Sequence, residues 1–169
     1  MKTLILLRHA KSGWDDPVAR DFDRPLNSKG ERAAFTMGRH ARSLGLSFDR
    51  VIASPAVRVV ETLTHFAEGY GRAIEPEWEK RAYLASASTL LDLVQAQPDS
   101  IDRLLLVGHN PGLEELVLDL VPASGGGELR GEVAAKFPTA SLAVLGIGRS
   151  WQDAGTGLAE LIRFVRPRD

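Results

Sequence analysis

The stretch Thr3-Leu4-Ile5-Leu6-Leu7-Arg8-His9 combines a short apolar run with two polar residues that follow it directly. An apolar run of this length, without charged interruptions, is typical of a central strand that is buried on both faces. Arg8 and His9 then stand at the carboxyl end of the strand, which is the edge where open parallel sheets bind their ligands. The stretch therefore predicts an α/β sheet with a functional site at the end of its first strand.

The same arrangement recurs twice later in the chain. Val51-Ile52-Ala53 predicts a second strand, and Ser54-Pro55 has the form of a helix N-cap followed by proline at the first helical position. Arg58 then falls in the first turn of the following helix. Leu104-Leu105-Leu106-Val107-Gly108-His109 predicts a third strand with a polar end, and Asn110-Pro111 repeats the cap and the proline.

Helical and strand patterns fill the remaining intervals. Ser28-Lys29-Gly30-Glu31 has the form of a capping box, and apolar residues then recur at helical spacing until Gly45, which we expect to end the helix. Residues 89–94 predict a further helix, and residues 140–147 and 157–165 predict later strands. The alternation of strands and helices predicts an α/β three-layer sandwich with a largely parallel central sheet.

Composition limits the class of protein and its partners. The chain has 169 residues, of which 44% are hydrophobic and 25% charged, so we expect residues 1–169 to form a single domain, with Gly125-Gly126-Gly127 as a loop inside it. The formal net charge of -1 provides no overall field toward nucleic acid or membrane lipid, so we expect neither as a partner. Arg8 and Lys11 interrupt the N-terminal apolar run before it reaches the length of a signal peptide, and we expect a cytoplasmic protein.

Residue types also restrict the chemistry. The chain contains no cysteine, which excludes disulfides, thiolate metal sites and phosphatase mechanisms with a cysteine nucleophile. His40 and His65 fall inside predicted helices without ligand partners at metal-binding spacing, so we expect structural or surface roles for them and neither a metal nor a cofactor.

A parallel sheet would bring Arg8, His9, Arg58 and His109 together at the carboxyl ends of its strands. Three separate strand-to-helix junctions would then each contribute a guanidinium or imidazole group. Helix N-termini at two of these junctions would add partly positive backbone N–H groups. This combination indicates an anion site and is well suited to phosphate.

Three segments carry a resemblance to a known family. They are Leu6-Leu7-Arg8-His9-Ala10-Lys11-Ser12, Ser54-Pro55-Ala56-Val57-Arg58 and Val107-Gly108-His109-Asn110-Pro111-Gly112. Together they resemble the histidine phosphatase superfamily. Asp23-Arg24-Pro25-Leu26 and Lys136-Phe137-Pro138-Thr139 are similar to segments of its small SixA-type phosphohistidine phosphatases.

The resemblance implies a phosphoglycerate-mutase-like fold and a metal-free reaction. His9 would attack phosphorus to form a phosphohistidine enzyme, and Arg8, Arg58 and His109 would bind the phosphoryl oxygens. Ser12 and Arg24 are candidate substrate contacts on the loop near the site. Nearby arginine charges would keep His9 unprotonated and nucleophilic.

The proton donor is the least defined part of the site. Many family members carry a glutamate shortly before a tyrosine-containing pair, and Glu79, four residues before Tyr83, is the candidate here. Asp21-Phe22-Asp23 superficially resembles an aspartyl-phosphate motif, but no apolar strand precedes it, so we do not expect a nucleophile there.

Three functions are compatible with these residues. The first is a phosphatase that acts on phosphohistidine proteins or other phosphoramidates. The second is a phosphomonoesterase that acts on a small phosphorylated molecule. The third is a non-catalytic phosphate-binding module, although binding alone has no need of the nucleophile His9.

Overall fold

The computed structural model describes residues 1–13, 20–125 and 127–168. Their strands are β1 (Lys2–Arg8), β2 (Arg50–Ala53), β3 (Glu77–Trp78), β4 (Arg103–Gly108), β5 (Leu142–Gly148) and β6 (Glu160–Val165). Their α-helices are α1 (Ser28–Ser43), α2 (Val57–Tyr70), α3 (Ala87–Gln95), α4 (Gly112–Leu120) and α5 (Gly127–Ala135). Short 3₁₀ helices cover Asp21–Asp23, Lys80–Ala82 and Trp151–Asp153. The predicted alternation of strands and helices is confirmed, and Gly126 of the predicted glycine loop lies outside the described residues.

The described strands form one sheet in the order β3-β2-β4-β1-β5-β6. Parallel pairing joins β3 to β2, β2 to β4 and β4 to β1. β5 runs antiparallel to β1, and β6 runs antiparallel to β5 and therefore in the same direction as β1. The prediction of a largely parallel sheet is thus confirmed, with β5 as the exception among the described strands.

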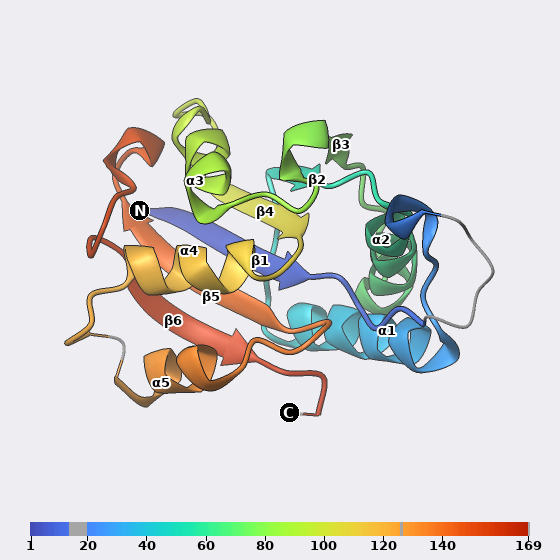
Figure 1. The fold of residues 1–169 in the computed structure, drawn as a ribbon. Helices are drawn as coiled ribbons and strands as arrows, with labels where there is room; N and C mark the ends of the chain where they lie inside the picture. Colours follow the sequence, from blue (N-terminus) through green and yellow to red (C-terminus); the bar gives the residue numbers. More distant parts are fainter. Residues whose placement is uncertain (14–19, 126, 169) are drawn as a thin grey trace.

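Helices cover both faces of this sheet, as the three-layer prediction requires (Figure 1). Ile5 and Leu7 of β1 pack in one apolar cluster with buried residues of α1 and α2. Leu4 and Leu6 belong to the opposite cluster, which contains buried residues of α3, α4 and α5. Because successive strand residues point to opposite faces, one uninterrupted apolar run fills both cores.

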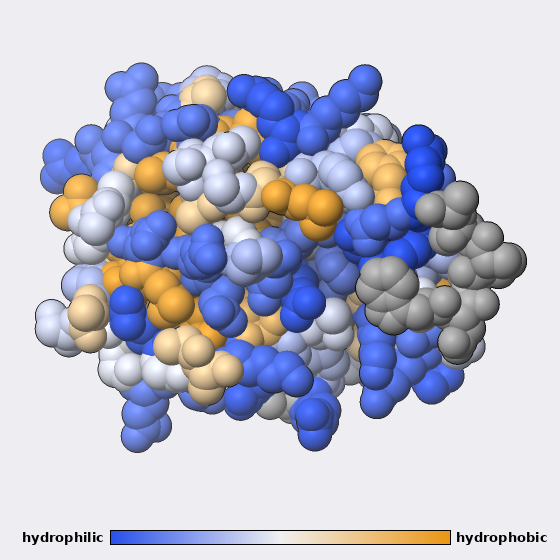
Figure 2. Space-filling view, viewed as in Figure 1, coloured by the Kyte–Doolittle hydropathy of each residue, from blue (hydrophilic) through white to orange (hydrophobic). Residues whose placement is uncertain are grey.

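The surface polarity differs between parts of the molecule. Figure 2, in the orientation of Figure 1, shows hydrophobic residues between α4 and α5 and mostly hydrophilic residues near the ends of β1 and β4. Within the described residues, no helix is both long and apolar enough to cross a membrane.

The predicted starts of three helices need correction. Asn27, not Ser28, caps α1, because its side-chain oxygen accepts a hydrogen bond from Gly30 N at 2.8 Å. The expected end is confirmed, since Gly45 follows the helix with a φ of 70°. Ser54 does not cap α2, which begins only at Val57.

The third correction concerns α4, which begins at Gly112, one residue later than Asn110-Pro111 predicted. Asn110 still satisfies a helical donor, because its Oδ1 accepts a hydrogen bond from Glu114 N at 3.2 Å.

Candidate active site

The polar ends of β1, β2 and β4 meet at one edge of the sheet. Arg8 pairs with Gly108, and Ala53 pairs with Val107, so the residues that follow these strands are neighbours in space. A cavity of about 380 Å³ opens at this edge. Its lining includes Arg8, His9, Ser12, Asp21, Arg24, Arg58 and His109. The structure therefore brings together the four residues predicted from the strand ends, along with both candidate contacts from the loop.

His9 follows β1 directly and is 9% exposed. Its Nδ1 lies 2.7 Å from the carbonyl oxygen of Ala10. A carbonyl can only accept a hydrogen bond, so Nδ1 carries the proton and Nε2 of the neutral ring keeps its lone pair. Burial lowers the pKa of His9 to about 4. The hydrogen bond to Ala10 opposes this shift, whereas the positive charges of Arg58, Arg8 and Arg24 lower the pKa further. His9 is therefore a neutral imidazole with a nucleophilic Nε2 at neutral pH.

His109 follows β4 and is 2% exposed. Its Nδ1 lies 3.4 Å from Arg58 Nη2, and its Nε2 lies 2.7 Å from Ser54 Oγ. A guanidinium can only donate, so Nδ1 accepts and Nε2 donates its proton to Ser54. Burial lowers the pKa of His109 to about 3, and electrostatic interactions with His9 and Arg58 lower it further. Ser54, predicted as a helix cap, instead fixes the tautomer of this histidine.

Two arginines stand beside the histidines. Arg58, from the first turn of α2, is 3% exposed. Arg8, the last residue of β1, donates from Nη1 to the carbonyl oxygen of Phe137 at 2.8 Å. Its buried Nε has no hydrogen-bond partner among the described residues. Buried donors without partners are rare in native proteins, and an oxyanion in the cavity would supply the missing acceptor.

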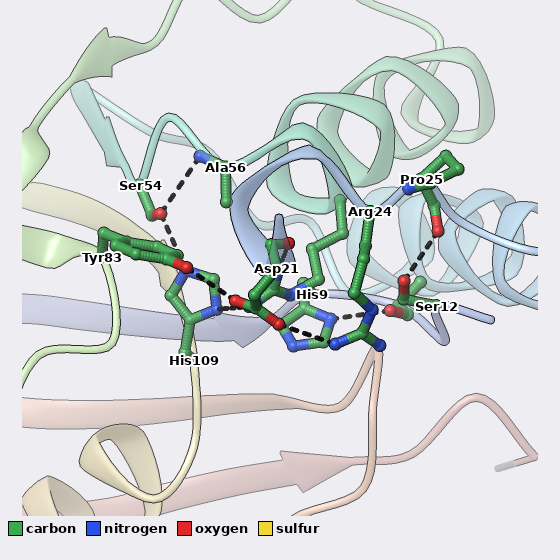
Figure 3. Close-up of polar contacts among 11 residues, drawn as sticks. His9, Ser12, Asp21, Arg24, Pro25, Ser54, Ala56, Tyr83 and His109 are labelled. Carbon is green, nitrogen blue, oxygen red and sulfur yellow. Dashed lines mark hydrogen bonds and ion pairs between the residues drawn. The ribbon is translucent and has the colours of Figure 1, made fainter. Parts of the chain in front are cut away.

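Asp21 is a site residue that the sequence did not reveal. It lies in the 3₁₀ helix Asp21–Asp23, and its Oδ2 accepts hydrogen bonds from Arg58 Nη2 at 2.9 Å and from the Tyr83 hydroxyl at 2.6 Å. Its Oδ1 accepts from Arg24 Nη1 at 2.8 Å, and its carbonyl oxygen accepts from Arg58 Nη1 at 2.8 Å. Figure 3 shows the carboxylate between Tyr83 and Arg24. The hydrogen bond from Tyr83 is the largest cause that lowers the pKa of Asp21, which is about 2, so the carboxylate is ionised at neutral pH.

Thr62, on α2, is a second residue that sequence patterns did not reveal. It is fully buried, and its Oγ1 accepts a hydrogen bond from Ala10 N at 2.9 Å and donates to the carbonyl oxygen of Arg58 at 2.6 Å. The hydroxyl of Thr62 therefore links two parts of the site. One is the backbone at Ala10, which orients His9, and the other is the helical turn that carries Arg58.

Ser12 and Arg24, the candidate substrate contacts, line the cavity, whereas Glu79, the candidate proton donor, is not among its described lining residues. Ser12 lines the cavity, where its hydroxyl donates to the carbonyl oxygen of Pro25 at 2.7 Å (Figure 3). Arg24 also lines the cavity and pairs with Asp21. Glu79 is not among the described residues that line the cavity, and its carboxylate pairs with Arg81 at 2.5 Å. Its role as proton donor stays a prediction.

The ranges that the structure describes contain no group of three or more His, Cys, Asp or Glu residues arranged to bind a metal ion. Asp15 and Asp16 of the sequence lie outside those ranges.

Known proteins share both the sequence and the fold. A sequence profile of the histidine phosphatase superfamily (branch 1) matches residues 4–83. An uncharacterized protein of Mycobacterium tuberculosis is 35% identical over 163 residues, which cover 96% of this chain and 100% of the relative. The solved "putative phosphohistidine phosphatase SixA" of Agrobacterium tumefaciens is 30% identical with a TM-score of 0.82, covering 98% of each chain. A structure of the same description from Nakamurella multipartitia is also 30% identical, with a TM-score of 0.84, covering 99% of this chain and 97% of that one. The similarity thus extends over nearly the whole chain.

Proposed function

Because this chain belongs to the histidine phosphatase superfamily and is a phosphatase of the SixA type, we propose that it hydrolyses phosphohistidine in proteins or another phosphoramidate. The observation that carries the proposal is the geometry of His9, whose Nδ1 donates to the carbonyl oxygen of Ala10 while Nε2 keeps its lone pair, and which lines the same cavity as Arg8 and Arg58. An arrangement that only bound phosphate would need the arginines but not this nucleophile.

The reaction has two displacements at phosphorus. In the first, His9 Nε2 forms a bond to phosphorus while the bond to the substrate nitrogen breaks, and the leaving imidazole takes its proton from water. In the second, a water oxygen attacks phosphorus, the bond to Nε2 breaks, and inorganic phosphate leaves with the restored imidazole of His9. Arg8 and Arg58 position the phosphoryl group and neutralise its charge, which is the main requirement of phosphoryl transfer, and His109 orients Arg58 through its Nδ1.

The carboxylates near the site favour a nitrogen leaving group. Within the described lining of the cavity the acidic side chain is Asp21, whose pKa of about 2 keeps it ionised and unable to donate a proton at neutral pH. An alkoxide needs a proton when the P–O bond breaks, whereas imidazole, with a conjugate-acid pKa of about 6.5, departs readily. The names of the Agrobacterium and Nakamurella relatives agree with this substrate class.

The first test is detection of the phosphoenzyme. The protein is mixed with an aryl phosphate, quenched rapidly without acid and analysed by mass spectrometry, and a phosphoryl group is expected on His9. His9→Ala should lose the adduct and the turnover but keep the fold. His40→Ala, which removes a histidine of α1 outside the cavity lining, is the matched control and should retain both. Wild-type turnover by His9→Ala would disprove the nucleophile.

The second test concerns the substrate class. We expect kcat/KM to be high for a phosphohistidine protein and an aryl phosphate and low for a sugar phosphate, because a general acid typically contributes about 10²–10⁴-fold. Glu79→Gln should change aryl phosphate turnover only slightly. Strong sugar phosphate turnover that collapses in Glu79→Gln would instead identify a phosphomonoesterase with Glu79 as its acid. A protein that binds phosphate but turns over none of these substrates would be a binding module.

A further inference from the structure

The most densely bonded carboxylate near the cavity is Asp21, and the mechanism above assigns it no step. Its carbonyl oxygen and its Oδ2 accept hydrogen bonds from the two terminal nitrogens of Arg58, and its Oδ1 accepts a hydrogen bond from Arg24. Charged N–H groups of this kind are the donors that bind the oxygens of a phosphoryl group. We call Arg8, Arg24 and Arg58 the phosphate cradle. In the structure, Asp21 therefore occupies donors of Arg24 and Arg58 that a bound phosphate would also need.

The position of Asp21 permits such competition. Its side chain is 37% exposed, whereas that of Arg58 is 3% exposed, so the acidic partner is the one that water reaches. Tyr83 also donates to its Oδ2. The carboxylate would thus keep a hydrogen-bond donor when an arginine turns toward a phosphoryl oxygen, and no buried acceptor would be left unsatisfied.

A purely structural ion pair would have a different arrangement. Asp23, two residues later, illustrates one: it pairs with Arg20 at 2.9 Å, the arginine side chain is 72% exposed, and neither residue lines the described cavity. Asp21, in contrast, lines the cavity together with both arginines that it binds. Its negative charge therefore acts on any anion that enters.

We infer that Asp21 is an internal ligand of the phosphate cradle, whose carboxylate competes with the phosphoryl group for Arg24 and Arg58 and so promotes the release of free phosphate. The inference rests on the proposed function, because that function assigns the cavity to phosphate. A cradle of several arginines with no opposing charge would hold the product tightly, and slow product release would limit turnover. Asp21 lowers that affinity while leaving His9 and Arg8 in place.

The test is the affinity for inorganic phosphate, measured by calorimetry without turnover and as competitive inhibition of aryl phosphate hydrolysis. Asp21→Asn keeps a side-chain acceptor but removes the charge, and it should bind phosphate about 10-fold more tightly than the wild type. The estimate reflects the repulsion between a unit charge and a phosphate dianion a few Å away, reduced by water around the partly exposed carboxylate. kcat should fall where phosphate release limits turnover, while the single-turnover rate of phosphoenzyme formation should not.

Three further variants sharpen the result. Asp21→Glu keeps the charge and should restore weak phosphate binding. Asp21→Ser provides a second neutral side chain in case Asp21→Asn fails to fold, and it should also bind phosphate more tightly. Asp23→Asn removes a neighbouring exposed carboxylate and should leave the affinity at the wild-type value. An equal gain in Asp23→Asn would overturn the inference, because the effect would then come from net charge alone.

The remaining outcomes separate the inference from the proposed function. Weaker phosphate binding and slower phosphoenzyme formation in Asp21→Asn would mean that Asp21 only orients Arg58, and would overturn the inference while the proposed function stood. Equal phosphate binding by the wild type and Asp21→Asn would do the same. If neither protein bound phosphate, the assignment of the cavity to phosphate would fail, and the proposed function would fail with it.

Discussion

A drop in pH from 7 to 5 should leave the His9 nucleophile almost fully in its active, neutral form. Burial, joined by the charges of Arg58, Arg8 and Arg24, lowers the pKa of His9 to about 4. At pH 5, about nine tenths of a histidine with that pKa is neutral, compared with about 3% of a histidine with the ordinary pKa of about 6.5. The site therefore predicts about 30-fold more active nucleophile at pH 5 than an ordinary histidine would supply.

Two measurements test this prediction. NMR titration of the His9 ring proton, assigned by its loss in His9→Ala, reports the pKa without substrate and should give a midpoint near 4. The single-turnover rate of phosphoenzyme formation from an aryl phosphate should give the same midpoint after correction for the substrate, whose phosphate titrates near pH 6. A midpoint near 6.5 in the folded protein would refute the argument that burial and nearby arginines keep His9 neutral.

The same pKa difference should appear in the free energy of unfolding. The pKa of His9 is lower in the folded protein than in the unfolded chain, so the unfolded chain binds the proton more readily below pH 6.5. The contribution of His9 to stability is complete above that pH and is lost progressively as the pH falls toward about 4. At pH 5 the loss amounts to about 2 kcal/mol. The lowered pKa of His109 adds a loss of the same sign, so denaturant unfolding at pH 7 and pH 5 should show a difference larger than that of His9 alone, and His9→Asn should remove the part due to His9.

Two other perturbations test the positioning of the nucleophile and the metal-free mechanism. Thr62→Val should lower kcat more than it changes KM and destabilise the fold by about 1–3 kcal/mol, because it leaves the buried Ala10 N–H without an acceptor. Thr62→Ser keeps the hydroxyl and should recover most of kcat, whereas a wild-type kcat in Thr62→Val would contradict the positioning role. Dialysis against a chelator should leave turnover intact; complete loss that one added divalent ion restores would contradict the metal-free reaction and make Asp15 and Asp16 the first residues to substitute.

The parts of the site that could be predicted from sequence are those that depend on local pattern. Arg8, His9 and His109 follow apolar runs, and parallel strands place their carboxyl ends at one edge of a sheet. Arg58 could be placed because it follows the second such run at the start of a helix. In each case, the position of the side chain follows from a few neighbouring residues and the general rules of α/β sheets.

Asp21 and Thr62 could not be predicted because their partners lie far away along the chain. Asp21 contacts Arg58 and Tyr83, which lie 37 and 62 residues away in the sequence, because the tertiary fold places its 3₁₀ helix beside them. Thr62 reaches the carbonyl oxygen of Arg58, a bond common to helical threonines, but nothing in the helix indicates its second bond to Ala10, 52 residues earlier. Tertiary packing decides both positions.

We propose His9, and not His109, as the nucleophile because of the partners that fix the tautomer of each ring. The two rings lie 5.2 Å apart between centroids, and burial lowers the pKa of both, so neither distance nor charge distinguishes them. In His109, Arg58 occupies the lone pair of Nδ1, and Ser54 accepts the proton of Nε2. In His9, the backbone carbonyl of Ala10 accepts the proton of Nδ1, and no hydrogen bond from the described residues occupies Nε2. Attack on phosphorus needs an unshared lone pair at the cavity, and His9 provides it while His109 is held to orient Arg58.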